Sequence, residues 1–349
     1  MESSTDQEHQ VHQRHAQGSS NGSSSSATRN PIVRLLRSLM PSCFRSSAPV
    51  PLPRPRVHHV WTGKNVFFLD GRVICGPDPR GLILTAMALL LSEWILLTYV
   101  VVDPLLSPHP ILVSVASLVL LATVTSSLLL TATRDPGIIL RRIPDSVSPS
   151  VEDGAISATR APRRFVVVNG VEMQLKFCRT CKIHRPPRSA HCAVCDNCVD
   201  KFDQHCPWTS QCVGLRNHRF YLLLLCSALA FYGFALTFSA RRIRAKLETP
   251  GARFFSLVTT LPETLILAVF SFMAVCALAC LLAFHAFLVA KNKTSHEWEK
   301  GRYRSSANPY DKGALGNIKE CLFDKLPPPG VDFGAAAEPS TWAPPVASC

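Results

Sequence analysis

Four long runs of apolar residues dominate the pattern along the chain. They cover residues 82–102, 111–132, 220–239 and 265–290, and Glu93 is their only charged residue. A helix needs about 20 predominantly apolar residues to cross the hydrocarbon core of a bilayer. One such run could be a buried core helix, but four of them at spanning length predict an α-helical integral membrane protein with four transmembrane helices.

Basic residues are distributed unevenly over the segments that connect these runs. Of the 37 Lys and Arg residues, 32 lie before the first run, in the middle segment 133–219, or after the fourth run. The positive-inside rule therefore places both termini and the middle segment in the cytosol. The group Arg241, Arg242, Arg244 and Lys246 follows the third run and opposes this orientation. We follow the larger number of basic residues, which places both termini and the middle segment in the cytosol.

The composition between the runs predicts the domain organisation. Residues 1–55 are rich in Ser, Gln, His and Asn and are expected to be disordered, as is the Pro- and Ala-containing tail 327–349. The other predicted parts are a cytosolic pre-membrane segment 56–81, spans one and two in 82–132, a cytosolic region 133–219 with a cysteine-rich domain at about 176–219, spans three and four in 220–290, and a cytosolic C-terminal region 291–326.

Overall composition narrows the class of protein. Only 17% of the residues are charged, which is below the quarter or so of a typical soluble domain. The formal net charge of +13 suits nucleic acid, anionic lipid or an anionic substrate. Because the cysteine-rich segment comes directly before a membrane span, we expect no nucleic-acid partner.

Cysteine is the strongest chemical signal. Seven of the 14 cysteines lie in residues 178–212, together with His184, His191 and His205. In a reducing cytosol, paired C-x-x-C motifs usually bind metal, and thiolate and imidazole ligands suit tetrahedral zinc. If His191 and His205 each join three cysteines in two four-ligand sites, one thiol is left over for chemistry. The alternative is a zinc-stabilised interaction module without catalysis.

These residues resemble the cysteine-rich domain of the DHHC-type protein S-acyltransferases, or palmitoyltransferases. The chain follows the family's C-x2-C, RPxR, HC-x2-C-x2-C, DHHCPW and NCVG-x2-N pattern almost position by position. Asp135-Pro136-Gly137 is similar to its DPG motif, Thr294-Ser295-His296-Glu297 to its TTxE motif, and Asn308-Pro309-Tyr310 to its C-terminal motif. The segment from Val57 to Asp78 is similar to that of plant members. The resemblance covers roughly residues 57–325.

The resemblance implies a set of ligands and a nucleophile. The first zinc would be bound by Cys178, Cys181, His191 and Cys198, and the second by Cys192, Cys195, His205 and Cys212. Cys206 would then carry a long-chain acyl group, such as palmitoyl, from acyl-CoA to cysteines of membrane-associated substrate proteins. The implied location is the endomembrane system, with membrane lipid around the four spans.

The chain departs from the family at one catalytic position. Asp203 is present, but Gln204 stands where the family has a histidine, and an amide cannot take a proton near neutral pH. General-base catalysis is worth roughly 10²–10⁴-fold. His184 or His218 could act instead. The rival hypothesis is a weakly active or inactive zinc-binding membrane scaffold.

Further residues receive roles from the same resemblance. Phe231 on the third span is expected near the acyl-chain cavity, where it would limit chain length. Arg185 and Arg188 are expected to meet the CoA phosphates. Ser295 keeps the hydroxyl that would bind Asp203.

Overall fold

The computed structural model describes residues 54–101, 109–141, 163–249 and 254–337. The expected disorder of residues 1–53 and 338–349 concerns segments outside the described residues.

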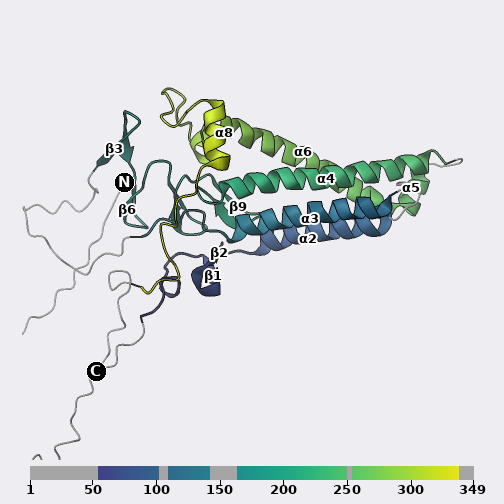
Figure 1. The fold of residues 1–349 in the computed structure, drawn as a ribbon, viewed down its shortest axis with the longest axis horizontal. Helices are drawn as coiled ribbons and strands as arrows, with labels where there is room; N and C mark the ends of the chain where they lie inside the picture. Colours follow the sequence, from purple (N-terminus) through teal and green to yellow (C-terminus); the bar gives the residue numbers. More distant parts are fainter. Residues whose placement is uncertain (1–53, 102–108, 142–162, 250–253, 338–349) are drawn as a thin grey trace, which may run out of the picture. The chain divides into compact units, whose positions relative to one another are not determined.

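Four helices in the described part are long and apolar enough to cross a membrane (Figure 1). They are α2 (Arg80–Ile95), which continues as the π-helix η3 (Leu96–Val101), α3 (Pro110–Thr133), α4 (His218–Leu247) and α6 (Pro262–Ala290). The short helix α5 (Phe254–Thr260) precedes α6. The predicted four-span membrane architecture is confirmed.

Helix α4 is the central helix of the bundle. Half of the residues in its most apolar stretch are buried, compared with 11% in the corresponding stretch of α6. Phe231 of α4 is fully buried and packs in one cluster with Leu89 of α2 and Val124 of α3. The apolar surface that remains on the other helices is suited to lipid, because lipid tails solvate such side chains as well as a protein core does.

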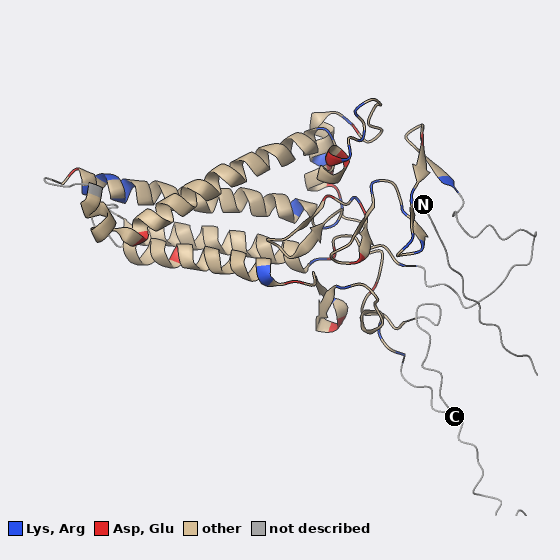
Figure 2. Cartoon of the chain, turned by 180° about the vertical axis from the view of Figure 1, so that it is seen from behind, with Lys and Arg blue, Asp and Glu red and all other residues tan. Residues whose placement is uncertain are grey.

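Polar contacts between the helices lie inside the bundle. Ser117 of α3 donates a hydrogen bond to Glu93 of α2 at 2.9 Å, and the hydroxyls of Ser127 and Ser227 lie 3.0 Å apart. Glu93, the only acidic residue of the apolar runs, therefore faces another helix. Its hydrogen bond with Ser117 offsets part of the free-energy cost of removing the carboxyl group from water. Figure 2 shows that Lys and Arg gather towards the two ends of the helices.

The third membrane helix is longer than its apolar run. It continues past Ser239 to Leu247, through the basic group that follows the run. Cationic side chains stabilise the C-terminal turns of a helix, and Arg242 also forms a 3.1 Å ion pair with Glu263 at the start of α6. The basic group is thus part of the helix end.

Within the described residues, the segments outside the membrane helices form five small antiparallel hairpins. The pairs are β1 (Val66–Phe68) with β2 (Val73–Cys75), β3 (Arg164–Val168) with β4 (Val171–Leu175), β5 (Phe177–Cys178) with β6 (Ile183–His184), β7 (Ala190–Cys192) with β8 (Asn197–Val199), and β9 (Gln204–Cys206) with β10 (Gln211–Val213). An isolated hairpin of this length is not stable in water. The hairpins therefore depend on contacts beyond their own strands.

The pre-membrane segment packs against residues that follow Pro327. It contains the 3-10 helices η1 (Val57–His59) and η2 (Leu69–Gly71). Ile74 and Ile138 form a buried cluster with Val331 and Phe333. At Gly71, which has a φ of 84°, an added Cβ would lie 2.9 Å from the Phe333 backbone, so this contact requires glycine.

The boundary of the tail therefore differs from the expected position at residue 327. The Pro-rich composition signalled disorder, but two large apolar side chains in this stretch bury themselves against the segment before the first span. The rest of the C-terminal region holds the short helix α7 (Ser295–Glu299) and helix α8 (Ala314–Phe323), which packs near the end of α6.

Phe333→Ala is expected to detach residues 327–337 from the pre-membrane segment. The Phe333 ring is 3% exposed and lies 5.0 Å from Trp61 and 4.8 Å from Phe67, between ring centroids. Truncation of a buried Phe costs about 3–5 kcal/mol, so limited proteolysis after residue 327 should become markedly faster. Phe323→Ala, at a ring that is 76% exposed, is the matched control and should leave the rate unchanged.

Candidate active site

Two groups of three cysteines and one histidine lie between α3 and α4 in the chain. Within each group the candidate ligand atoms all lie within 4.8 Å of one another. The groups are Cys178, Cys181, His191 and Cys198, and Cys192, Cys195, His205 and Cys212. The structure thus brings together the eight residues that the sequence resemblance assigned, in the same two sets.

Strand geometry explains how neighbouring residues reach different groups. His191 and Cys198 are cross-strand partners in the β7–β8 hairpin, as are His205 and Cys212 in the β9–β10 hairpin. Successive side chains of a strand point to opposite faces. Cys192 therefore points away from His191 and joins the other group.

The donor atoms of each group fit a metal ion. The hydrogen bond from the Cys198 thiol lowers the pKa of Cys181 to about 5, whereas the hydrogen bond with Cys192 raises the pKa of Cys195 to about 12. Neighbouring thiolates at this spacing repel one another unless a cation lies between them, and a divalent cation removes this repulsion. Each group can hold one metal ion, and three sulfurs with one nitrogen are a usual zinc set.

The first group also has an outer partner of the kind found around bound metals. Nδ1 of His191 lies 3.5 Å from the Cys181 sulfur, while Nε2 lies 3.4 Å from Oδ1 of Asp196. A carboxylate on the second nitrogen fixes the orientation of a metal-binding imidazole.

Cys206 belongs to neither group. It lies on β9 with Gln204, on the face opposite to His205. The Cys206 side chain is 6% exposed and packs with Val213, Tyr221 and Leu225. Leu281 and Leu282 of α6 pack against the same cluster. The remaining thiol of residues 178–212 therefore lies against two membrane helices.

Asp203 and Gln204 have defined partners beside this thiol. The Asp203 carboxylate, 3% exposed, accepts hydrogen bonds from the Ser295 backbone N–H at 2.7 Å and the Ser295 hydroxyl at 3.0 Å. The Gln204 amide donates a hydrogen bond to the Tyr221 hydroxyl at 2.9 Å. The expected bond between Ser295 and Asp203 is present, but the partner of Gln204 was not anticipated.

A buried ion pair fastens the hairpins to the segment after α6. Arg188 donates two hydrogen bonds to Glu297, at 3.0 and 2.8 Å, and two more to Asn292. Glu297 is 1% exposed and also completes a capping box with Thr294 at the start of α7. A bidentate pair of this kind fixes geometry strongly. The Arg188 guanidinium thus holds the Thr294–Glu297 motif in place.

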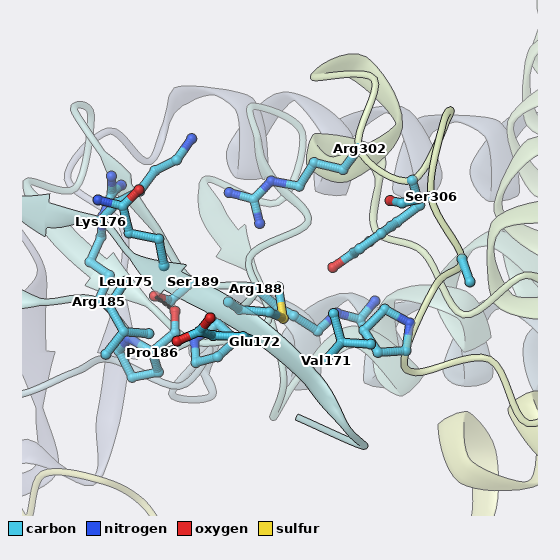
Figure 3. A pocket seen from close by; sticks show the side chains of 16 residues that line it. Val171, Glu172, Leu175, Lys176, Arg185, Pro186, Arg188, Ser189, Arg302 and Ser306 are labelled. Carbon is cyan, nitrogen blue, oxygen red and sulfur yellow. Dashed lines mark hydrogen bonds between the residues drawn. The ribbon is translucent and has the colours of Figure 1, made fainter. Parts of the chain in front are cut away.

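Cations line two cavities on either side of the Asn308–Tyr310 motif. Figure 3 shows the first, a cavity of about 350 Å³ lined by Lys176, Arg185 and Arg302. Burial and the charges of Arg302 and Arg185 lower the pKa of Lys176, as expected where like charges crowd together. The second, of about 430 Å³, is lined by Asp203 and His218 together with Lys201, Arg219, Lys293 and other residues.

The two histidines offered as alternative bases lie in different surroundings. His184 packs against Phe177 on the neighbouring strand, at 5.0 Å between ring centroids. His218 and His285 each place a ring nitrogen within 4.8 Å of the Asp203 carboxylate. Sequence reasoning did not place His285 beside Asp203. The sequence feature that could have drawn attention to His285 is that it is the single imidazole in the otherwise apolar run 265–290.

Comparisons with known proteins match this arrangement. The family model for the DHHC palmitoyltransferase matches residues 171–302. "Probable protein S-acyltransferase 1" of Arabidopsis thaliana is 36% identical over 303 residues, which are 81% of this chain and 86% of the relative. The chain belongs to the DHHC palmitoyltransferase family. A second relative, "Probable protein S-acyltransferase 7" of the same plant, is 33% identical over 83% of this chain and 68% of the relative. Human "Palmitoyltransferase ZDHHC14" is 30% identical over 83% of this chain and 62% of the relative.

Membership of the DHHC family confirms the resemblance seen in the sequence. The relatives are named protein S-acyltransferases and palmitoyltransferases, so the chain is a transferase of that class and a multi-pass membrane protein. The comparisons do not favour an inactive scaffold over this activity.

Cys181→Ser is expected to release metal and loosen the hairpins. Cys181 is fully buried in the first group, and the binding energy of a closed metal site is folding energy. Metal analysis of the purified protein should show a loss of about one equivalent, and protease cleavage within residues 163–217 should accelerate. Cys226→Ser, at an exposed thiol on α4, is the matched control. An unchanged metal content in the Cys181 variant would contradict the assignment.

Proposed function

We propose that this chain moves a long-chain acyl group, such as palmitoyl, from acyl-CoA to cysteines of membrane-associated proteins through a thioester on Cys206. The observation that carries the proposal is the position of this thiol. It is the one cysteine of residues 178–212 outside both metal groups, and it packs against helices α4 and α6. A thiol at that position can meet an acyl chain that lies in the membrane.

The reaction consists of two thioester exchanges. The Cys206 sulfur attacks the acyl carbonyl of acyl-CoA, the bond to the CoA sulfur breaks, and CoA leaves as its thiol with the proton from Cys206. A substrate cysteine then attacks the Cys206 thioester, and Cys206 takes up the proton of that thiol. Both steps require a thiolate as the attacking group.

Two zinc ions would hold the nucleophile in place. In the proposed assignment, Cys178, Cys181, His191 and Cys198 bind one ion, and Cys192, Cys195, His205 and Cys212 bind the other. The ions supply a structural crosslink between hairpins that lack a large core of their own. Because His205 precedes Cys206 directly, the second group fixes the strand that carries the thiol.

The acidic partner is proposed from the contacts around Cys206, and the acyl site from the packing of Phe231 in the bundle. Asp203, held by Ser295, is proposed to supply negative charge near the reacting groups. Gln204 is proposed to orient the Tyr221 hydroxyl, which packs in the same cluster as Cys206. Phe231 fills the centre of the bundle and is proposed to limit how far an acyl chain can enter.

The CoA phosphates are proposed to bind the cation-lined cavities. The cavity beside Asp203 offers Lys201, Arg219 and Lys293, and the adjacent cavity offers Arg185. Positive clefts of this kind attract anionic ligands. Arg188 was expected to share this task, but its donors are bound to Glu297 and Asn292, so we assign it to positioning the C-terminal motif.

Cys206→Ser is expected to abolish hydroxylamine-sensitive labelling by a clickable palmitoyl-CoA analogue. A serine hydroxyl is far less acidic than a thiol and has no general base at position 204 to help it. Cys226→Ser, which removes an exposed thiol of α4, should label like the wild type. Absence of label from the folded, metal-loaded wild type would instead favour the scaffold hypothesis.

The proposed location is an endomembrane compartment with both termini and the cysteine-rich region in the cytosol. The chain contains a glycosylation sequence, Asn21-Gly22-Ser23, which should stay unmodified in this orientation. An acceptor sequence inserted with a flexible spacer between residues 103 and 108 should be glycosylated in microsomes. Modification at Asn21 together with an unmodified insertion would reverse the orientation and remove the argument for reduced thiols.

A further inference from the structure

The chain lacks an imidazole at the position where its family resemblance leads one to expect the catalytic base. The amide of Gln204 cannot accept the thiol proton near neutral pH. It is also engaged, because it donates a hydrogen bond to the Tyr221 hydroxyl at 2.9 Å. The buried carboxylate of Asp203 nevertheless remains, held by two hydrogen bonds from Ser295. The site keeps the acid that would orient an imidazole.

The two thioester exchanges proposed for Cys206 give no role to the imidazole of His285. It lies near the end of α6, in a helix with no other charged or imidazole-bearing residue after Glu263. The side chain is 1% exposed, and neither ring nitrogen has a hydrogen-bond partner among the described residues. Buried polar groups are nearly always paired, so an imidazole in this state calls for a partner that binds during the reaction.

The position of His285 connects the Asp203 carboxylate with the Cys206 cluster. A ring nitrogen of His285 lies within 4.8 Å of an Asp203 carboxylate oxygen. The His285 ring stands nearly perpendicular to the Tyr221 ring, at 5.1 Å between centroids. Tyr221 packs with Cys206, and so do Leu281 and Leu282, one turn before His285 on α6. The imidazole therefore contacts Tyr221, which packs against the nucleophile.

The other histidines near the site are less well placed. His218 also lies beside Asp203, but its Nδ1 faces the Cys321 sulfur at 3.5 Å. The His184 ring packs against Phe177, and the His296 ring packs against Phe202. Among these imidazoles, His285 is the one that combines contact with Tyr221, proximity to Asp203 and two unassigned nitrogens.

We propose that His285 supplies from the fourth membrane helix the imidazole that position 204 lacks. It accepts the proton of the Cys206 thiol as the sulfur attacks the acyl carbonyl, and it gives this proton to the CoA sulfur as the carbon–sulfur bond of acyl-CoA breaks. The imidazolium that exists in between is stabilised by the Asp203 carboxylate, in the manner of a catalytic triad. This inference rests on the proposed function, since it assigns a base to the Cys206 reaction.

The test is a double-variant cycle on the full-length purified protein. Acyl-enzyme formation at Cys206 is timed with a fluorescent palmitoyl-CoA analogue for the wild type, His285→Gln, Gln204→His and the variant with both changes. Loss of a general base should slow His285→Gln by roughly 10²–10⁴-fold. In the His285→Gln background, Gln204→His should restore most of the lost rate. Added imidazole should also accelerate His285→Gln.

Controls separate a chemical role from a structural one. His184→Gln removes an imidazole that packs against Phe177, away from Asp203, and should stay within a few-fold of the wild type. Metal analysis on every variant confirms that the hairpins are intact. A merely structural role of His285 would not be relieved by a histidine placed at residue 204.

Three results would overturn the inference. One is a His285→Gln protein as fast as the wild type. Another is a double variant no faster than His285→Gln although its metal content is retained. The third is the loss of an additional metal equivalent in His285→Gln, which would assign Asp203, His218 and His285 to metal binding. Failure of all four proteins to form a thioester would refute the proposed function itself.

Discussion

The crowding of thiols into two four-residue groups is the constraint on which the site depends. The hairpins of residues 177–213 have strands of two or three residues and cannot hold themselves together by packing alone. The ligand atoms of each group lie within 4.8 Å of one another, where a cation can offset the repulsion between thiolates. The convergence of these residues constrains the path of the chain, and that path leaves Cys206 on the opposite face of its strand, against the membrane helices.

Two polar contacts then connect this metal-dependent region to the membrane bundle. The Arg188–Glu297 ion pair is almost fully buried, and removal of either partner would leave an uncompensated charge. The bonds from Ser295 to Asp203 attach the β9–β10 hairpin, which carries Cys206, to the same segment. Because this segment follows α6 directly, the hairpin and the fourth membrane helix are held in one arrangement. His285 of that helix thereby comes to lie beside Asp203.

The sequence alone was sufficient to predict the features that depend on the local spacing of residues. The four membrane helices follow from the length of the apolar runs, and the two ligand sets follow from the cysteine pattern through its resemblance to the family. The positions of His285 and Tyr221 were not predictable, because these residues meet Asp203 and Gln204 only when helices distant in sequence pack together. The same holds for Val331 and Phe333, whose apolar side chains lie in a Pro-rich stretch and find their partners about 260 residues earlier. The contact of Arg188 with Glu297 was equally out of reach, because the two residues are 109 positions apart in the chain.

The most direct test of the account is a combined count of metal and acyl groups on one preparation of the wild-type protein. After a single turnover with palmitoyl-CoA, elemental analysis should find two zinc ions per chain, and peptide mass spectrometry should find a hydroxylamine-sensitive acyl group on the peptide that contains Cys206. The other cysteines of residues 178–212 should be unmodified while the metal is bound. An acyl group on one of the eight assigned metal ligands, or a metal-loaded protein with no acyl group on Cys206, would contradict the claim that Cys206 is the thiol left free for catalysis.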